Sequence, residues 1–310
     1  MIEVEGLSKR FATLLAVENL DFSVHPGEVV ALLGPNGAGK STTMKMIAGF
    51  LAIDAGRVRV AGHDVMTDGL AARRALGYLP EGAPGYGEME VLDFLGFIAD
   101  VRGLAGERRS TRIAYVVDRL QLGGVRRQPL DTLSKGFRRR VGLAAAILHE
   151  PAVLMLDEPT DGLDPNQKHE VRGLIEELSR ERTILLSTHL LEEVEAIATR
   201  ALVMARGRLR ADTTPAGLLA LSRHAGALSF VTPDSVAAVA ALDGLVSAMD
   251  TAIEVRESRV LLFVKGRDVS ADAVSRRLTE RSIAYTDLRS ERGRLDEVFR
   301  ALTHDTEAEG

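Results

Sequence analysis

The sequence predicts an α/β protein whose first part is a parallel sheet flanked by helices. The apolar run Val29–Leu33 leads into a glycine-rich loop and then into the helix-like stretch TTMKMIAG. A second apolar run, Ala152–Leu156, is followed by a helical pattern near 167–180, the strand-like TILLS and another helical pattern near 190–199. Apolar strands that alternate with helical stretches are typical of a parallel sheet covered by helices.

The stretch from about 82 to 150 has a helical pattern and predicts a helical insertion in this first domain. It is punctuated by glycine turn signals at Gly103, Gly106, Gly123 and Gly124. The motifs that carry chemistry stop near 213–221, after a predicted strand pair around Gly207. We therefore expect a first domain over residues 1–221 and an accessory α+β domain over residues 222–310.

The second domain is predicted to be a small ferredoxin-like module. Its elements follow the order β-α-β-β-α-β, with a strand at 227–231, a helix from Ser235, a hairpin at 252–264, a helix near 270–281 and a strand at 283–288. The closing RLDEVFRALT is expected to form an amphipathic helix, and the final HDTEAEG is expected to fray.

Composition narrows the classes of function. The 310 residues carry a formal net charge of -5, so a basic face for nucleic acid is not expected. The chain has no cysteine, which fits a reducing compartment, and we expect a cytoplasmic protein. We expect no export signal in MIEVEGLSKRF, and no apolar stretch approaches the about 20 residues that cross a bilayer. A role at a membrane would therefore need a partner.

The glycine-rich loop predicts a phosphate site. It matches the P-loop pattern and lies between a predicted strand and a predicted helix; its residues are Gly34, Pro35, Asn36, Gly37, Ala38, Gly39, Lys40 and Ser41, followed by Thr42. Glycines let backbone N–H groups surround phosphate oxygens, Lys40 adds a positive charge, and the Ser41 hydroxyl can ligate Mg²⁺. The alternative is an ordinary glycine-rich turn before a helix.

Two carboxylates end the second apolar run. Asp157 and Glu158 directly follow Val153–Leu156, as in a Walker B strand. We expect this strand and the phosphate-loop strand to lie side by side, with their carboxyl ends facing one ligand. Asp157 would hold Mg²⁺ through water, and Glu158 would accept a proton from the attacking water or orient it. The alternative for Glu158 is a solvated acid.

A further segment resembles a family signature. Leu133–Phe137 reads LSKGF and is similar to the LSGGQ motif of ABC transporter nucleotide-binding subunits, from which Lys135 and Phe137 depart. The resemblance implies an ABC-type P-loop NTPase fold in which Ser134 and Gly136 contact the γ-phosphate of ATP bound to the other copy of a homodimer. Lys135 and the arginines that follow Phe137 are expected to be solvated or acid-paired at the start of a helix and outside the site; the alternative is a direct contact with phosphate.

Three more positions match the family in order. Asp164, in the segment DGLD, resembles part of the D-loop that links the two ATP sites of the dimer. His189, after TILLST, resembles the switch histidine that touches the γ-phosphate, whereas a lone histidine is more often structural. Phe11 lies where the family stacks an aromatic ring on adenine, and a core phenylalanine is the alternative.

One position departs from the general pattern. Glu81, in GYLPEG, stands where most members of the family have a glutamine, and the surrounding sequence resembles the gliding-motility-associated subgroup of exporters. The LSKG form of the signature resembles that of drug-resistance, sodium-extrusion and gliding-motility exporter ATPases. We expect Glu81 to lie on the magnesium side of the site, directly or through water. The alternative is a solvent-facing residue that caps the helical insertion.

The resemblance implies an ATP-hydrolysing subunit of an exporter, with ATP and Mg²⁺ as ligands. A separate membrane permease would be contacted near Glu81–Leu95, which would hold the protein at the inner face of the cell membrane. The alternative is a soluble ABC-type switch in translation or on chromosomes, but the chain shows neither two cassettes nor a long coiled-coil interruption. A binding module without turnover is disfavoured because Glu158 and His189 are both present.

Overall fold

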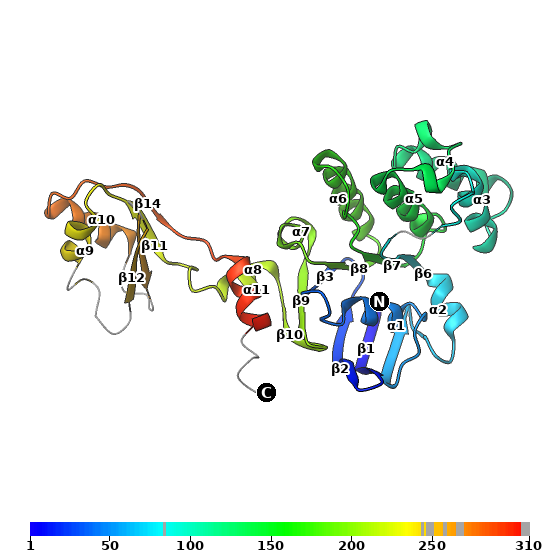
Figure 1. Cartoon of the computed structure of the whole chain (residues 1–310), viewed down its shortest axis with the longest axis horizontal. Helices are drawn as coiled ribbons and strands as arrows, with labels where there is room; N and C mark the ends of the chain where they lie inside the picture. The colour runs from blue at the N-terminus through cyan, green and yellow to red at the C-terminus, as the bar shows by residue number, and fades with distance from the viewer. Residues whose placement is uncertain (83–84, 243–244, 246–250, 257–258, 265–269, 305–310) are drawn as a thin grey trace. The chain divides into compact units, whose positions relative to one another are not determined.

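The computed structural model describes residues 1–82, 85–242, 245, 251–256, 259–264 and 270–304 (Figure 1). Contacts divide the chain into two compact units, Met1–Pro215 with Leu302–Gly310, and Ala216–Ala301. The second unit thus begins before the predicted boundary at Leu221. One reason is close packing, because a side chain at Gly293 would clash with the carbonyl of Leu219. Residues 305–310, most of the segment expected to fray, lie outside the described residues.

The main sheet of the first unit has six strands among the described residues: β3 (Val29–Leu33), β6 (Leu76–Leu79), β7 (Val153–Asp157), β8 (Thr183–Thr188), β9 (Arg200–Ala205) and β10 (Arg208–Thr213). Their order is β10-β9-β3-β8-β7-β6, and only β10 pairs antiparallel with its neighbour. β3, β7 and β8 are buried throughout, as parallel strands with both faces covered should be.

The expectation that the phosphate-loop strand and the acidic strand are neighbours is wrong. β8 lies between β3 and β7 and pairs in parallel with both. The order of strands along the chain could not reveal this, because crossover helices let a later strand insert between two earlier ones. The consequence is functional, since the residues that follow β8 then lie between the phosphate loop and the carboxylates.

A second sheet of the first unit has the order β2-β1-β4-β5 and is antiparallel. Its strands are β1 (Ile2–Phe11), β2 (Leu14–Val24), β4 (Ala55–Val60) and β5 (His63–Asp64). Apolar residues of this sheet, of the main sheet and of α1 (Lys40–Ile47) form one buried core, which includes Leu7, Leu20 and Met44. This shared core fixes the phosphate loop at the start of α1.

The helical part of the first unit follows β6. Its helices are α3 (Val91–Val101), α4 (Gly106–Arg119), η1 (Gly123–Val125), η2 (Leu130–Thr132) and α5 (Lys135–Ile147). Figure 1 shows α3, α4 and α5 gathered in one cluster, and α5 packs on β6. Gly106 begins α4 with a positive φ and does not form a separate turn. The other helices are α2 (Gly69–Ala75), α6 (Pro165–Ser179) and α7 (Leu191–Ile197).

The second unit has a four-stranded antiparallel sheet in the order β12-β13-β11-β14. The strands are β11 (Leu228–Val231), β12 (Thr251–Arg256), β13 (Arg259–Val264) and β14 (Thr286–Ser290). The helices that lie wholly or mostly in this unit are α8 (Pro215–Ala220), α9 (Ser235–Leu242), α10 (Ala271–Glu280) and α11 (Leu295–His304). Phe230, Val260 and Leu278 are among its buried core residues. Within the part of the chain that the structure describes, no helix combines the length and apolarity needed to span a membrane.

Candidate nucleotide-binding site

The phosphate loop connects β3 to α1, and two of its glycines are required by packing. A side chain at Gly34 would place Cβ 2.5 Å from the carbonyl oxygen of Met204. Gly39 has a φ of 103°, a left-handed conformation, and its Cβ would lie 2.6 Å from the carbonyl oxygen of Ala16. The backbone of the loop therefore approaches its neighbours more closely than any side chain would allow.

Lys40 is the charged group of this loop, and its side chain is buried. Its Nζ donates to the carbonyl oxygens of Gly34, at 2.6 Å, and Pro35, at 3.1 Å. Burial lowers the pKa of the Lys40 amino group, and the negative charges of Glu158 and Asp157 oppose that shift. The fold has therefore brought the lysine of the loop within electrostatic reach of the two carboxylates that follow β7.

Asp157 has the features of a magnesium ligand. Its side chain is 2% exposed, and its Oδ1 accepts a hydrogen bond from the hydroxyl of Ser187 at the end of β8. Its Oδ2 is buried and has no hydrogen-bond partner among the described residues. An unpartnered buried carboxylate oxygen is costly unless a cation or a proton occupies it. This oxygen and the Ser41 hydroxyl fit a magnesium site.

The protein alone does not build a metal cage there. Among the described residues, no group of three or more His, Asp or Glu side chains could hold a metal ion. Mg²⁺ usually takes one or two protein ligands and completes its shell with phosphate oxygens and water. The donor set of Asp157 and Ser41 therefore suits a metal that arrives together with a nucleotide.

Glu158 and His189 form a pair at the ends of β7 and β8. The Nδ1 atom of His189 lies 2.9 Å from Oε2 of Glu158. The side chain of His189 is 50% exposed and that of Glu158 is 16% exposed. Glu158 has a left-handed backbone with a φ of 52°, and its N–H donates to the carbonyl of Ser187 at 3.1 Å. The carboxylate is therefore held in one direction, beside a histidine that can respond to a ligand.

Glu81 lies in the turn after β6 and its side chain is exposed. Its charge acts on Lys40, where it joins Glu158 and Asp157 in opposing the effect of burial on the lysine pKa. Glu81 therefore lies near enough to Lys40 for its charge to act there, and its exposed side chain also agrees with the solvent-facing alternative. Its role as a metal-side ligand stays a prediction.

A cavity of 560 Å³ lies over the phosphate loop. The expected residues that line it are Phe11, Asn36, Gly37, Gly39, Lys40, Ser41 and Thr42, whereas Gly34, Pro35 and Ala38 of the loop do not line it. Phe11 is 44% exposed, so it is not a core residue, and the Nζ atom of Lys9 lies 5.5 Å from its ring centre. Arg206, in the turn between β9 and β10, also lines the cavity and carried no motif signal. The cavity joins an aromatic surface to a phosphate-binding loop.

The three predicted nucleotide contacts that lie after the phosphate loop in the sequence do not line this cavity. Ser134 caps α5, since its hydroxyl accepts the N–H of Phe137 at 3.3 Å. Asp164 caps α6, since its Oδ1 accepts the N–H of Gln167 at 2.9 Å. Gly136 is buried against the start of α6 and the loop before it, and its Cβ would lie 3.0 Å from Oε1 of Gln167 and 3.3 Å from the carbonyl of Gly162. These positions are consistent with contacts to a second copy, which remain predicted.

The expectation that the arginines after the signature segment are solvated or acid-paired is wrong for two of the three. Arg138 is exposed, but Arg139 and Arg140 are each 5% exposed. The guanidinium of Arg140 stacks 4.2 Å from the ring centre of Phe137, and that of Arg139 reaches backbone carbonyls at the ends of β6 and β7. Helical periodicity turns these two side chains inward, which the run of charges concealed.

Lys135 behaves as expected and pairs with an acid. Its Nζ lies 2.8 Å from Asp161, and both side chains are largely exposed. Screening by water makes such a pair worth little to stability. Lys135 thus gives no sign of a structural role beyond joining the start of α5 to the loop that follows β7.

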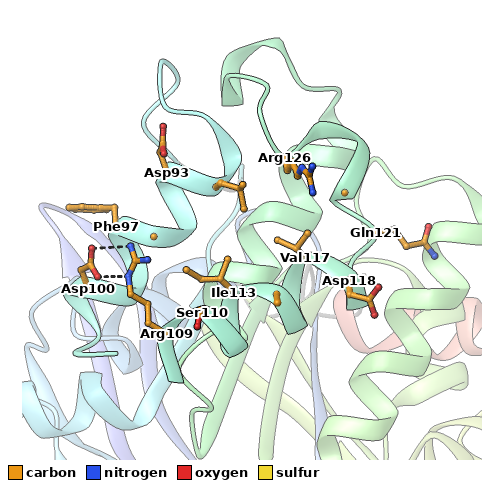
Figure 2. Close-up of a pocket in the computed structure, with 14 residues that line it drawn as sticks. Asp93, Phe97, Asp100, Arg109, Ser110, Ile113, Val117, Asp118, Gln121 and Arg126 are labelled. Atoms are coloured by element: carbon orange, nitrogen blue, oxygen red, sulfur yellow. Dashed lines mark hydrogen bonds and ion pairs between the residues drawn. The ribbon is translucent and has the colours of Figure 1, made fainter. Parts of the chain in front are cut away.

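A larger cavity lies elsewhere in the first unit. It has a volume of 1100 Å³ and is lined by α3, α4 and the residues that follow α4, with Asp100 and Arg109 paired at its edge (Figure 2). None of the residues of the phosphate loop or the carboxylate pair lines it. The larger cavity is therefore not the candidate nucleotide site. The smaller cavity is, because the phosphate-loop residues line it.

Comparison with known proteins agrees with this assignment. Residues 17–161 match the family model described as ABC transporter. The daunorubicin resistance ATP-binding protein DrrA3 of Streptomyces coeruleorubidus is 36% identical over 98% of this chain and 96% of its own length. The chain belongs to the ABC transporter family. Its predicted recognition as an ABC ATP-binding subunit is therefore confirmed.

Two other matches cover a smaller part of this chain than the match to DrrA3 does. The probable multidrug ABC transporter ATP-binding protein YbhF of Escherichia coli (strain K12) is 37% identical over 72% of this chain, which spans only 39% of that protein's length. A solved ATP-binding subunit of an ABC transporter matches with a TM-score of 0.67 and 31% identity, over 70% of this chain and 91% of its own. The ABC ATPase fold of the first unit is thereby confirmed.

Proposed function

We propose that this ABC protein hydrolyses ATP as the motor subunit of an exporter whose membrane-spanning part is a separate permease. The observation that carries the proposal is the meeting of Lys40, Asp157, Glu158 and His189 at the carboxyl edge of one sheet. Similarity to proteins named for daunorubicin resistance and multidrug transport supports export. The sequence resemblance around Glu81 supports the same direction.

The arrangement suits hydrolysis of the terminal phosphate of ATP. Glu158 would orient a water and accept its proton while the water oxygen attacks the γ-phosphorus, and the bond to the β-phosphate oxygen breaks to release ADP. His189, beside Glu158, would donate to a γ-phosphate oxygen, and Lys40 would neutralise charge on the phosphates. Mg²⁺ held by Asp157 and Ser41 would supply further charge neutralisation.

A second copy of the chain would complete each site. Ser134 and Gly136 begin α5, a helix whose N-terminus favours anions, yet neither lines the cavity over the phosphate loop of their own chain. In a two-fold symmetric dimer the α5 N-terminus of one copy can face the phosphate loop of the other. ATP bound between them would hold the dimer closed, and hydrolysis would let it open.

The permease would dock beside α3. A cavity of 760 Å³ there is lined by aromatic and apolar residues, among them Phe50, which is 72% exposed, and Phe94 of the segment predicted to contact the permease. Four arginines also line it: Arg73, Arg74, Arg102 and Arg108. This chemistry fits an amphipathic segment with acidic residues, and such docking would place the protein at the inner face of the membrane.

The second unit is inferred to be a ferredoxin-like domain with an accessory role. Its β-α-β-β-α-β order and its strand order β12-β13-β11-β14 support this fold. Several of its polar side chains pair with one another, as Arg259 does with Asp287 and His224 with Glu297. Because none of the phosphate-loop, magnesium or base residues lies in it, its role would be to stabilise or regulate the dimer.

The test is ATP turnover and permease capture by the chain expressed in its native cells. The wild-type chain, recovered from solubilised membranes, should release phosphate from ATP and carry a multi-spanning polypeptide with it. Lys40→Ala should abolish phosphate release and keep the permease, because Lys40 lies at the phosphate loop. Lys45→Ala, which changes an exposed lysine of the same helix, should retain both properties.

The alternative function, a soluble ABC-type switch, makes the opposite prediction for the partner. Such a protein would hydrolyse ATP but would be recovered with ribosomal or chromosomal components and with no multi-spanning polypeptide. Turnover without a permease would therefore refute the exporter and leave the ATPase assignment standing. A wild-type chain that binds ATP without turnover would refute the hydrolytic part.

A further inference from the structure

Arg139 occupies an unexpected place in the site. It lies on α5, one turn after Ser134, and its side chain is 5% exposed. Its guanidinium donates to three backbone carbonyls: Nη1 to Pro80, at 2.9 Å, and Nη2 to both Asp157 and Glu158. Pro80 follows β6, and the two acids end its neighbour β7, so one side chain joins the carboxyl ends of two adjacent strands.

These carbonyls need a donor because the sheet ends there. After β7 the chain turns sharply, and Glu158 adopts a left-handed conformation, which is unfavourable for a residue with a side chain. This turn directs two consecutive carbonyls toward a single guanidinium. On the other side, the N–H of Glu158 donates to Ser187 of β8 at 3.1 Å. The backbone of Glu158 is therefore fixed by two sets of hydrogen bonds. Arg139 donates to the carbonyls of Asp157 and Glu158, and the N–H of Glu158 donates to Ser187.

We propose that Arg139 is a positioning residue for hydrolysis, which fixes the direction of the Glu158 carboxylate by holding the backbone on either side of it. This inference rests on the proposed function, since it assigns Arg139 a role only through the base that Glu158 provides. An arginine suits the task because its planar fork offers several donors in fixed directions. A lysine has the charge but cannot span three carbonyls with the same geometry.

The same contacts connect two parts of the site within one chain. Ser134 and Gly136 form the start of α5, and Arg139 follows on the next turn of the same rigid helix. A ligand that displaces the start of α5 therefore also displaces the donor that holds Glu158. The carbonyl of Pro80 belongs to the residue before Glu81, so the turn that carries Glu81 is anchored by the same guanidinium.

The experiment compares Arg139→Lys and Arg139→Gln with Arg138→Ala, a change at the neighbouring exposed arginine of the same helix. Phosphate release is expressed per mole of bound fluorescent ATP analogue, so that unfolded protein does not count. A base displaced by about 1 Å loses about 10²-fold in rate. Both Arg139 variants should therefore lose about 10²-fold in kcat with an unchanged KM for ATP, while Arg138→Ala keeps the wild-type kcat.

A double-mutant cycle separates positioning from a merely structural role. In single-turnover assays, Arg139→Lys should add no further loss to Glu158→Gln, because a residue that acts through Glu158 has nothing left to position. An equal fold-loss in both backgrounds, or a wild-type kcat for Arg139→Lys, would overturn the inference. A wild-type chain without any turnover would instead refute the proposed function itself, so the two failures are distinguishable.

Discussion

The two ends of α5 are held in opposite ways. At the C-terminal end, Arg112 donates to the carbonyls of Ile147, at 3.1 Å, and Leu148, at 3.0 Å, and the next residue, His149, packs in a partly buried position. At the N-terminal end the cap is Ser134 itself, which is exposed, as is Lys135. One end is closed by the rest of the fold, and the other is presented outward.

The difference separates stability from activity along one helix. Changes near the closed C-terminal end should alter the free energy of unfolding and leave turnover of the folded protein intact. Changes near the presented N-terminal end, or at Glu158, whose backbone carbonyl accepts a hydrogen bond from Arg139, should alter turnover and leave stability nearly intact. A variant that breaks this division would show that the two ends are not independent.

The largest effect is expected at the carboxylate beside the N-terminal end. Glu158→Gln should lower the rate of phosphate release by about 10² to 10⁴, because the amide cannot accept the proton of the attacking water. ATP binding should be retained, and gel filtration with ATP should show a trapped dimer. Glu195→Gln, at an exposed acid of α7, is the matched control and should behave as wild type. Wild-type turnover in Glu158→Gln would remove it as the base.

A smaller effect is expected at the C-terminal end. Burial, aided by the charges of Arg102 and Arg112, lowers the pKa of His149 from 6.5 to about 4. In the folded protein the ring stays neutral at a pH where the unfolded chain binds a proton, so the free energy of unfolding falls as the pH drops from 6.5 toward 4. From this residue the loss at pH 5 should be about 2 kcal/mol.

The check is urea unfolding of the wild type and His149→Gln at pH 7 and pH 5. The ring nitrogen Nε2 of His149 lies 3.2 Å from the carbonyl of Leu76, and a glutamine amide can donate to the same oxygen. The variant should therefore lose less stability between the two pH values than the wild type, and should keep its turnover at pH 7. Equal losses in both proteins would show that His149 is protonated without penalty.

The smallest effect is expected at Glu81. If this exposed carboxylate lies on the metal side of the site, Glu81→Gln should remain active but need about tenfold more Mg²⁺ for half-maximal turnover, which corresponds to about 1.4 kcal/mol. Glu88→Gln, at an exposed acid of the same segment, is the control. Superimposable Mg²⁺ titrations of Glu81→Gln and wild type would place Glu81 in solvent.

The sequence predicted those parts of the site that depend on short stretches of backbone. The phosphate loop could be recognised because glycines at fixed spacing, a lysine and a serine follow an apolar strand, and each has a local reason to be there. The α/β fold could be recognised for the same reason, since alternating apolar and helical stretches are local patterns. Asp157 and Glu158 could be assigned to the site only because a phosphate loop lies upstream in the sequence.

What the sequence could not predict depends on contacts between distant residues. The insertion of β8 between β3 and β7 is a property of topology, and it brings Ser187 to Asp157. Arg139 reads as one of three solvated arginines until the carbonyls of β6 and β7 lie against it. His149 shows no motif, and its lowered pKa arises from burial and from arginines of other elements.

The central claim is that each ATP site is shared by two copies of the chain, with Lys40 from one copy and Ser134 from the other. The most direct measurement mixes two inactive variants, Lys40→Ala and Ser134→Ala, and follows phosphate release. In a mixed dimer one site carries both defects and the other carries neither. Random pairing at equal amounts should therefore restore about a quarter of the wild-type activity in a two-fold symmetric dimer.

Lys40→Ala mixed with the double variant Lys40→Ala, Ser134→Ala forms no intact site and is the matched control for this measurement. The account predicts recovered activity in the first mixture, with a maximum near equal amounts, and none in the control. A first mixture that at every ratio stays at the sum of its separate components would contradict the shared site and would place Ser134 and Lys40 in the same chain's chemistry.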